Sequence, residues 1–116
     1  MAKTETLFLI KSRQDSWLRG NGLHGILQCL FFKSPLLIDL AEELLAEIKT
    51  RKQLPASEWK TLVQKFNVTV SNYESCLQRL KAAGIVRKEK GIYSLSNDFS
   101  RFLNAVSEIW MDWRAS

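Results

Sequence analysis

A stretch in the second half of the chain carries polar and basic side chains of the kinds that contact nucleic acids. The amides of Asn72 and Gln78 could pair with adenine edges, whereas Arg79 and Lys81 suit phosphates. Serine hydroxyls serve bases or phosphates, and a carboxylate is repelled by phosphates unless it accepts from a cytosine amine. The candidate contact residues of this stretch are Val70, Ser71, Asn72, Glu74, Ser75, Gln78, Arg79 and Lys81.

A second basic group follows in a predicted β-hairpin. Residues 85–88 have strand propensity, residues 89–91 supply a turn that contains Gly91, and residues 92–96 alternate apolar and polar beyond Tyr93, as a returning strand would. The basic residues near the turn are Arg87, Lys88 and Lys90.

Two short helices must position the first group of residues. Ser57 is expected to cap the first helix, whose apolar residues recur at spacings of three and four and therefore share one buried face. Those residues are Trp59, Leu62, Val63 and Phe66. The second helix is expected to end at Gly84, a residue suited to a left-handed C-terminal position. Its inward side is predicted to carry Tyr73, Cys76, Leu77 and Leu80.

This order of two helices, a tight turn and a basic hairpin resembles a winged helix-turn-helix, a fold family most often used to bind duplex DNA. The resemblance places Val68 in the core between the two helices. Two caps are open for the second helix: Ser71 with Glu74 forms a capping-box pattern, but the family pattern favours Thr69. By the same resemblance, Arg87, Lys88 and Lys90 would reach a minor groove or flanking phosphates.

The local charge agrees with this interpretation. From Lys65 to Gly91 there are six basic and two acidic residues, a balance of +4 in a chain whose net charge is +5. A positive surface of this kind is typical of nucleic-acid binding. The alternative is a solvated basic surface on a unit that contacts protein, because winged helices also serve as interaction modules.

Further helices are expected on both sides of this unit. Ser34 and Pro35 form a cap and a first helical residue for a helix to about Arg51, and residues 53–55 could form a short strand that pairs with the hairpin. The buried face of that helix is expected to contain Leu36, Leu37, Leu40, Ala41, Leu44, Leu45 and Ile48. Residues 23–32 predict a helix buried on more than one side, and a helix is favoured over a strand for residues 4–18.

The C-terminal segment predicts a helix with a heptad seam. Asn97 is expected to cap it, and Leu103 broadens the seam. The candidate dimer or partner interface consists of Phe99, Phe102, Val106, Ile109, Trp110 and Trp113. Two outcomes are open: the helix pairs with another chain, or it folds back onto the N-terminal helices. If the helices on both sides of the motif join two protomers, the arrangement is similar to that of the MarR regulator family.

Length and composition bound the protein class. The 116 residues, 46% of them hydrophobic, predict one domain with a helical extension (1–33), a winged-helix core (34–96) and a C-terminal dimerisation helix (97–116). The expected fold class is mainly α with a small β-hairpin. No apolar run suits a membrane span or a secretory signal, so a cytoplasmic location is expected, nucleoid-associated if prokaryotic.

Chemistry other than binding has little support in the sequence. Cys29 and Cys76 are isolated, and with the single His24 they form no zinc ligand set, so buried thiols are expected rather than a redox pair. No phosphate-binding loop or nucleophile motif is present. We therefore expect neither an enzyme, nor a cofactor, nor a metal.

The expected function is double-stranded DNA binding, sequence-specific or semi-specific, by a homodimeric transcriptional regulator. The alternative is a protein-interaction adaptor that docks through the C-terminal aromatic helix. RNA binding has weaker support, because no aromatic stacking platform accompanies the basic residues.

Overall fold

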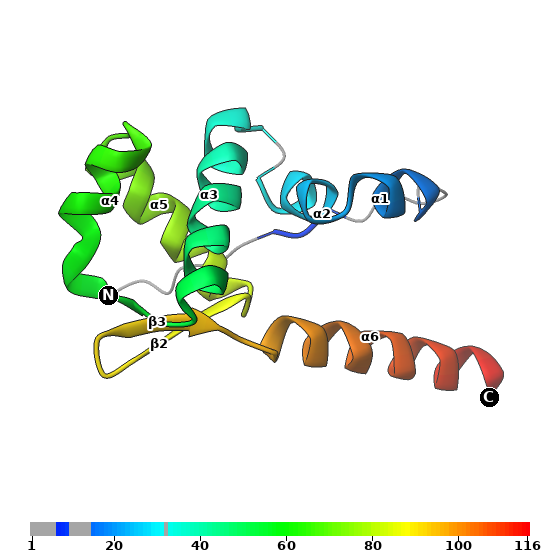
Figure 1. Cartoon of the computed structure of the whole chain (residues 1–116). Helices are drawn as coiled ribbons and strands as arrows, with labels where there is room; N and C mark the ends of the chain where they lie inside the picture. The colour runs from blue at the N-terminus through cyan, green and yellow to red at the C-terminus, as the bar shows by residue number, and fades with distance from the viewer. Residues whose placement is uncertain (1–6, 10–14, 32) are drawn as a thin grey trace.

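The computed structural model of the chain describes residues 7–9, 15–31 and 33–116. It is mainly helical and has one small three-stranded antiparallel sheet, so the expected fold class is confirmed (Figure 1). The elements are α1 (Asp15–Asn21), α2 (Leu23–Leu30), α3 (Pro35–Arg51), β1 (Leu54–Pro55), the 3-10 turn η1 (Ala56–Glu58), α4 (Trp59–Phe66), α5 (Val70–Ala82), β2 (Val86–Glu89), β3 (Ile92–Leu95) and α6 (Asp98–Ala115).

Helix α3 is the centre of the core, and it contacts α2, α5, β1 and β3. It begins as predicted, with Pro35 after Ser34, whose hydroxyl accepts a hydrogen bond from the N–H of Leu37 at 3.4 Å. Its buried residues are Leu37, Ile38, Leu40, Ala41, Leu44, Leu45 and Ile48. The expectation for Leu36 was wrong: it is 52% exposed, because it lies about 100° around the helix from Leu37, outside this stripe.

The N-terminal part differs from the predicted helix over residues 4–18. Residues 7–9 have no regular secondary structure; the N–H of Leu9 donates to the carbonyl of Cys29 at 2.9 Å, and Phe8 packs edge-on against Phe99. The prediction is therefore wrong for residues 7–9, where a contact with distant chain decides the conformation. Helix α1 (Asp15–Asn21) confirms the prediction for residues 15–18, and residues 4–6 and 10–14 lie outside the described part of the chain.

Helix α2 confirms the helix expected from residue 23 onward. Leu27 and Leu30, and Phe31 just after the helix, are fully buried, whereas Leu23 is exposed. The helix is therefore buried mainly on the side that faces α3. The predicted burial on more than one side does not include its first residue, Leu23. The structure confirms the predicted buried thiols, since Cys29 and Cys76 are free and buried.

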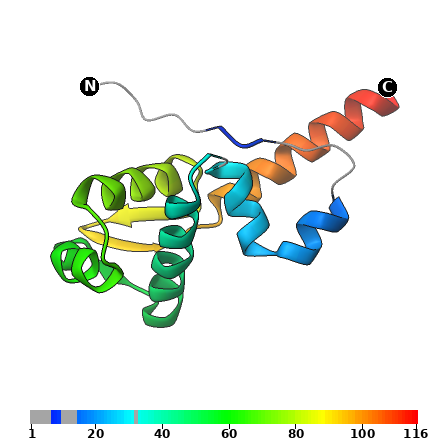
Figure 2. The ribbon, with the colours of Figure 1, turned by 90° about the horizontal axis from the view of Figure 1, so that it is seen from above.

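The sheet has the order β1-β3-β2. The expected short strand is confirmed as Leu54–Pro55, which pairs antiparallel with β3 so that Leu54 lies opposite Tyr93. Strands β2 and β3 form the expected hairpin around Lys90 and Gly91, whose φ angles of 51° and 75° are those of a two-residue hairpin turn with two left-handed residues. Figure 2 shows the hairpin between α3 and α5, and β3 contacts α3 while β2 contacts α5.

Besides Ser34, the Thr69 cap is confirmed, whereas Ser57 is not a cap and Asn97 stands at the N-cap position of α6 without a side-chain bond. Ser57 lies inside η1, and α4 begins at Trp59 without a side-chain cap. Asn97 precedes α6 but makes no cap bond; the Ser96 hydroxyl accepts from the Asp98 N–H at 3.1 Å instead. For α5, the Thr69 hydroxyl accepts from the Asn72 N–H at 3.0 Å, so the cap favoured by the family pattern is the one formed.

Helix α6 projects away from the rest of the molecule (Figure 1). Only its first turn is anchored: the Phe99 N–H donates to the Gly84 carbonyl at 3.0 Å. Gly84 has a φ of 79°, and a Cβ there would lie 3.0 Å from Asp98 and from the Phe99 nitrogen, so this close approach requires glycine. The rest of α6 is exposed, and the option that it folds back onto the N-terminal helices is not realised.

Candidate nucleic-acid interface

Helix α5 presents one buried and one open side. Tyr73, Cys76, Leu77 and Leu80 are buried, as the periodicity predicted. Val68, at the turn before the helix, is half-buried and packs against the core. The apolar stripe therefore fixes which residues of α5 can face a ligand.

The candidate residues on α5 divide by exposure. Val70, Ser71, Glu74 and Gln78 are exposed, whereas Asn72, Ser75, Arg79 and Lys81 are half-buried. The exposed set carries one carboxylate and no basic side chain. An α5 contact to DNA would therefore rely on hydroxyl and amide groups, with phosphate binding left to other elements.

Arg79 lies toward the N-terminal helices. Its Nη1 donates to the Leu30 carbonyl at 3.4 Å, and its guanidinium stands 5.5 Å from the centre of the Phe31 ring. These contacts hold α5 against the end of α2. The placement departs from the DNA-facing role that the sequence suggested for Arg79.

The β2–β3 hairpin carries the accessible positive charge of this region. Arg87, Lys88 and Lys90 are all exposed. Arg87 lies 3.5 Å from the carboxylate of Glu89, and the Lys88 ammonium stands 5.6 Å from the ring centre of Tyr93. Both contacts are at the surface, so neither removes the side chains from an incoming phosphate.

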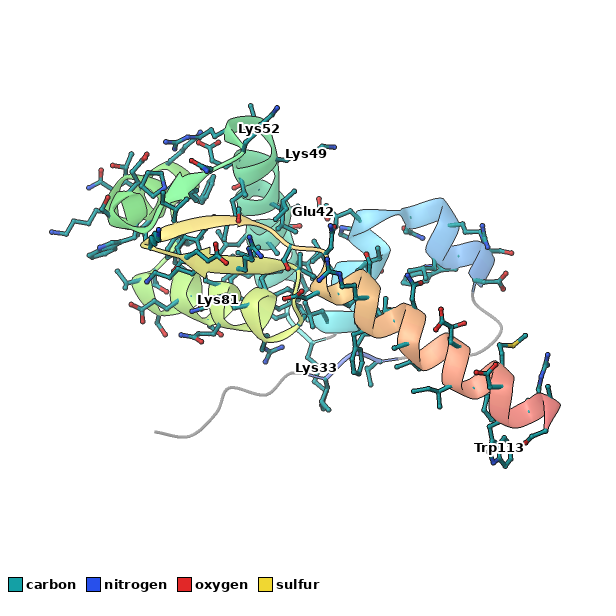
Figure 3. All side chains as sticks on the ribbon, turned by 90° about the horizontal axis from the view of Figure 1, so that it is seen from below. Lys33, Glu42, Lys49, Lys52, Lys81 and Trp113 are labelled. Carbon is teal, nitrogen blue, oxygen red and sulfur yellow. The ribbon has the colours of Figure 1, made fainter. Side chains whose placement is uncertain are left out.

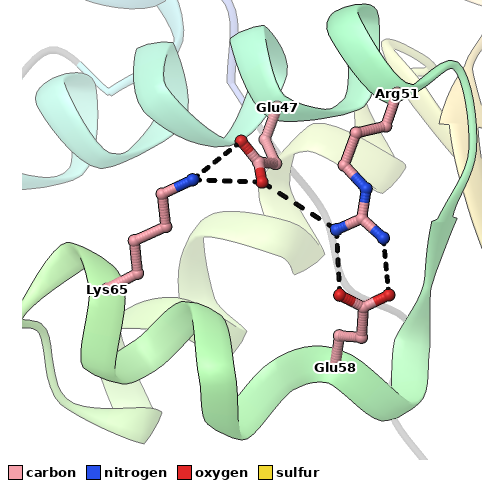
Figure 4. Close-up of polar contacts among 4 residues, drawn as sticks. All are labelled: Glu47, Arg51, Glu58 and Lys65. Carbon is pink, nitrogen blue, oxygen red and sulfur yellow. Dashed lines mark hydrogen bonds and ion pairs between the residues drawn. The ribbon is translucent and has the colours of Figure 1, made fainter.

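Lys65 is engaged elsewhere. Its ammonium donates to both carboxylate oxygens of Glu47 on α3, at 3.2 and 3.1 Å (Figure 4). Part of the basic excess counted along the sequence is therefore neutralised by an acid 18 residues earlier.

Figure 3 shows Lys81 on α5 and Lys49 on α3 on opposite sides of the hairpin, so basic residues outside the candidate surface also contribute to the net charge.

Two shallow cavities flank the hairpin and the start of α6. One of about 380 Å³ lies between α2, α3 and the end of β3, and its apolar lining includes Leu23, Leu45 and Leu95. The other, of about 650 Å³, is at the base of α6. The residues that line this second cavity include Phe8, Lys81, Phe99, Phe102 and Leu103. No sequence pattern indicated this cavity, since Phe8 and Phe99 are 91 residues apart.

Burial shifts the pKa of several titratable groups in the described part of the chain. Burial raises the pKa of Tyr73 and of the Cys76 thiol, each to about 12. His24 is half-buried, and its Nδ1 contacts the Glu42 carboxylate. Among residues 7–9, 15–31 and 33–116 no group of three or more histidine, cysteine or acidic residues could hold a metal ion. No helix in these ranges is long and apolar enough to cross a membrane.

Comparison with known proteins gives one family. A model described as an archaeal family matches residues 23–113, more than three quarters of the chain. The chain belongs to this archaeal family. Neither the curated proteins nor the solved structures gave a match.

The segment matched by the archaeal family runs from the first residue of α2 to Trp113 near the end of α6. It contains the whole core around α3, the candidate surface of α5 and the hairpin, and the exposed α6. Residues 1–22, which include α1, precede the match. The exposed C-terminal helix is thus part of the family segment and not an addition to it.

Proposed function

We propose that the protein binds double-stranded DNA, with the open side of α5 toward the major groove and the β2–β3 hairpin on the flanking backbone. The order α3, β1, α4, α5, β2, β3 supports this proposal, because it is the order of a winged helix-turn-helix. The three residues between α4 and α5, and the pairing of β1 with β3, agree with the same architecture.

The observation that carries the proposal is the exposed hairpin with Arg87, Lys88 and Lys90 beside α5. Basic residues at such a position can neutralise phosphates without desolvating other charges. The exposed polar residues of α5 would then read or follow the groove. The proposed role is that of a dimeric transcriptional regulator in the cytoplasm, or in the nucleoid if the cell is prokaryotic, that acts by binding and not by catalysis.

The test is the binding of a random DNA duplex, followed by fluorescence anisotropy over a salt series. If Arg87, Lys88 and Lys90 of the hairpin each contact a phosphate, the slope of log K against log salt is expected to be about −2.7 per protomer, or about −0.9 for each contact. Absence of binding at low salt would refute the proposal. Equal binding to single-stranded RNA would favour RNA as the ligand.

A protein-interaction adaptor is the second candidate. It is favoured by α6, whose apolar residues from Phe102 to Trp113 are exposed. An adaptor would be a monomer on its own and would not bind DNA. Sedimentation and the anisotropy series together distinguish the two functions.

A further inference from the structure

The apolar side of α6 is a continuous surface that nothing in the described chain buries. Phe102 is 68% exposed, and Ile109 and Trp113 are each 69% exposed. The remaining residues of this surface, which we call the α6 stripe, are Leu103, Val106 and Trp110. The rings of Trp110 and Trp113 stack at 5.6 Å. Figure 3 shows Trp113 at the free end of the helix, pointing away from the rest of the molecule.

We propose that the α6 stripe binds the α6 stripe of a second copy of this chain, with the two helices antiparallel. This deepens the proposed function by naming its protein partner. The pairing itself can be measured without DNA, so that either proposal can fail alone.

The spacing of the stripe suits antiparallel pairing with itself. Val106 and Trp113 occupy one core position of the heptad, and Phe102 and Ile109 the other. Antiparallel helices place these two kinds of position opposite each other. The layers are then Phe102 against Trp113 of the second copy, and Val106 against Ile109, each occurring twice. Aromatic layers close both ends of the seam, and β-branched side chains fill its middle.

The side chains next to the seam agree with this register. On one side, Leu103 falls beside Trp110 of the second copy, which extends the apolar contact. On the other side, Arg101 falls near Asp112 of the second copy, so two opposite charges face each other twice. In a parallel pair, Arg101 would instead lie beside Arg101 of the second copy, and Asp112 beside Asp112 of the second copy. The antiparallel arrangement also opposes the two helix dipoles.

The cavity at the base of α6 supplies a place for the end of the partner helix. Its lining includes Phe8, Phe99, Phe102 and Leu103. In the antiparallel register, Trp113 of the second copy lies opposite Phe102 and therefore at the mouth of this cavity. Lys81 and Asp98 also line the cavity, so an indole would fill its apolar part, and a parallel pair would leave that part empty.

The size of the contact is sufficient for a specific dimer. Three large aromatic and three aliphatic side chains from each copy would bury on the order of 1,000 Å² or more in total, which reaches the range of specific interfaces. An 18-residue helix is about 27 Å long. The two bodies would thus stand apart by a distance of the order of one DNA turn, ~34 Å, as two copies of α5 require for adjacent half-sites.

The test is sedimentation velocity of the full chain, without DNA, over a range of concentrations. Wild type is expected to dimerise, and Ile109→Asp to weaken the dimer by at least about a hundredfold, because it buries two carboxylates and removes two apolar contacts. Asn104→Asp is the matched control: it adds the same charge on the opposite side of α6 and should leave the dimer intact. Trp113→Ala is a second variant of the α6 stripe. It lies near the free end of α6, where a substitution does not affect the fold of the protomer.

The register has its own test. Asp112→Arg should weaken the dimer, since it would place two arginines together at each flank. Adding Arg101→Asp should restore the dimer, because the charges are then exchanged, and a parallel pair would show no such rescue. A wild-type monomer at all concentrations would overturn the proposal and favour the adaptor, and a dimer that Ile109→Asp leaves unchanged would overturn it as well.

Discussion

Arg51, the last residue of α3, holds Glu58 just before α4 by two parallel hydrogen bonds. The Nη1 to Oε1 distance is 2.9 Å and the Nη2 to Oε2 distance is 2.6 Å (Figure 4). Glu47 lies 3.8 Å from the same guanidinium and also accepts from Lys65 on α4. The four side chains connect α3 to both ends of α4. They thereby help to fix α4, and through it the start of α5, relative to the core.

Replacing Glu58 tests this connection. The hydrogen bonds from Arg51 lower the pKa of Glu58, so its contribution to stability is present above the ordinary carboxyl pKa and is lost as pH falls through the lowered one. Glu58→Gln should reduce the free energy of unfolding by urea at neutral pH. The reduction should shrink in high salt and in acid, because the pair is near the surface.

Glu43→Gln is the matched control for this change, since Glu43 is an exposed residue of α3 that pairs with no described residue. It should leave the urea midpoint nearly unchanged. If the two variants lose the same stability at every pH, the Arg51 contact contributes nothing specific.

The two sides of α3 should differ strongly in their tolerance of alanine. Leu44 is fully buried, and Leu44→Ala is expected to cost about 2–5 kcal/mol of unfolding free energy through lost burial and a cavity. Leu36 is half exposed to solvent, and Leu36→Ala should change stability by no more than about 0.5 kcal/mol. Urea denaturation of both variants measures this difference. Similar losses would show that Leu36 is covered in solution.

The hairpin should carry a measurable part of DNA affinity. Lys88→Ala combined with Lys90→Ala is expected to weaken binding to all duplex sequences and to reduce the salt slope by about 1.8, since two phosphate contacts are removed. The control is Arg19→Ala with Lys49→Ala, which removes the same charge from α1 and α3. Anisotropy with the random duplex should show the loss only for the hairpin variant. Equal slopes for both variants would mean that net charge, and not the hairpin, drives binding.

Stability should decline in alkali. Burial raises the pKa of Cys76 from its ordinary 9.0 to about 12, and that of Tyr73 from 10.0 to about 12. Both groups stay protonated in the folded chain while the unfolded chain ionises. Their contribution is therefore complete below about pH 9 and is lost as the pH rises toward the raised values. Urea unfolding between about pH 8 and pH 11 measures the decline.

Cys76→Ala separates the two groups. The variant starts from a lower stability because it loses a buried side chain, but its decline should begin about one pH unit later, where only tyrosine ionises. Parallel curves for wild type and variant would show that Cys76 ionises normally in the folded protein.

Local sequence determined most of the secondary structure. Ser34 with Pro35, Thr69, and the Lys90–Gly91 turn mark element ends by contacts within a few residues, and these were predictable. The buried side of α5 followed from apolar spacing alone. Ser57 and Asn97 are the exceptions, because the bonds that would have made them caps were replaced by a 3-10 turn and by Ser96.

Tertiary structure decided where the charges and the chain ends lie. Arg79 faces Leu30 and Phe31, and Lys65 faces Glu47, through contacts that span 49 and 18 residues of sequence. Residues 7–9 have no regular secondary structure, and the N–H of Leu9 donates to the carbonyl of Cys29, 20 residues later in the sequence. The sequence predicted the apolar stripe of α6, but the spacing of side chains cannot tell whether other parts of the same chain cover that stripe. The stripe stays open because α6 runs away from the rest of the molecule (Figure 1). The close approach of Gly84 to Asp98 and Phe99 sets the direction in which the helix starts.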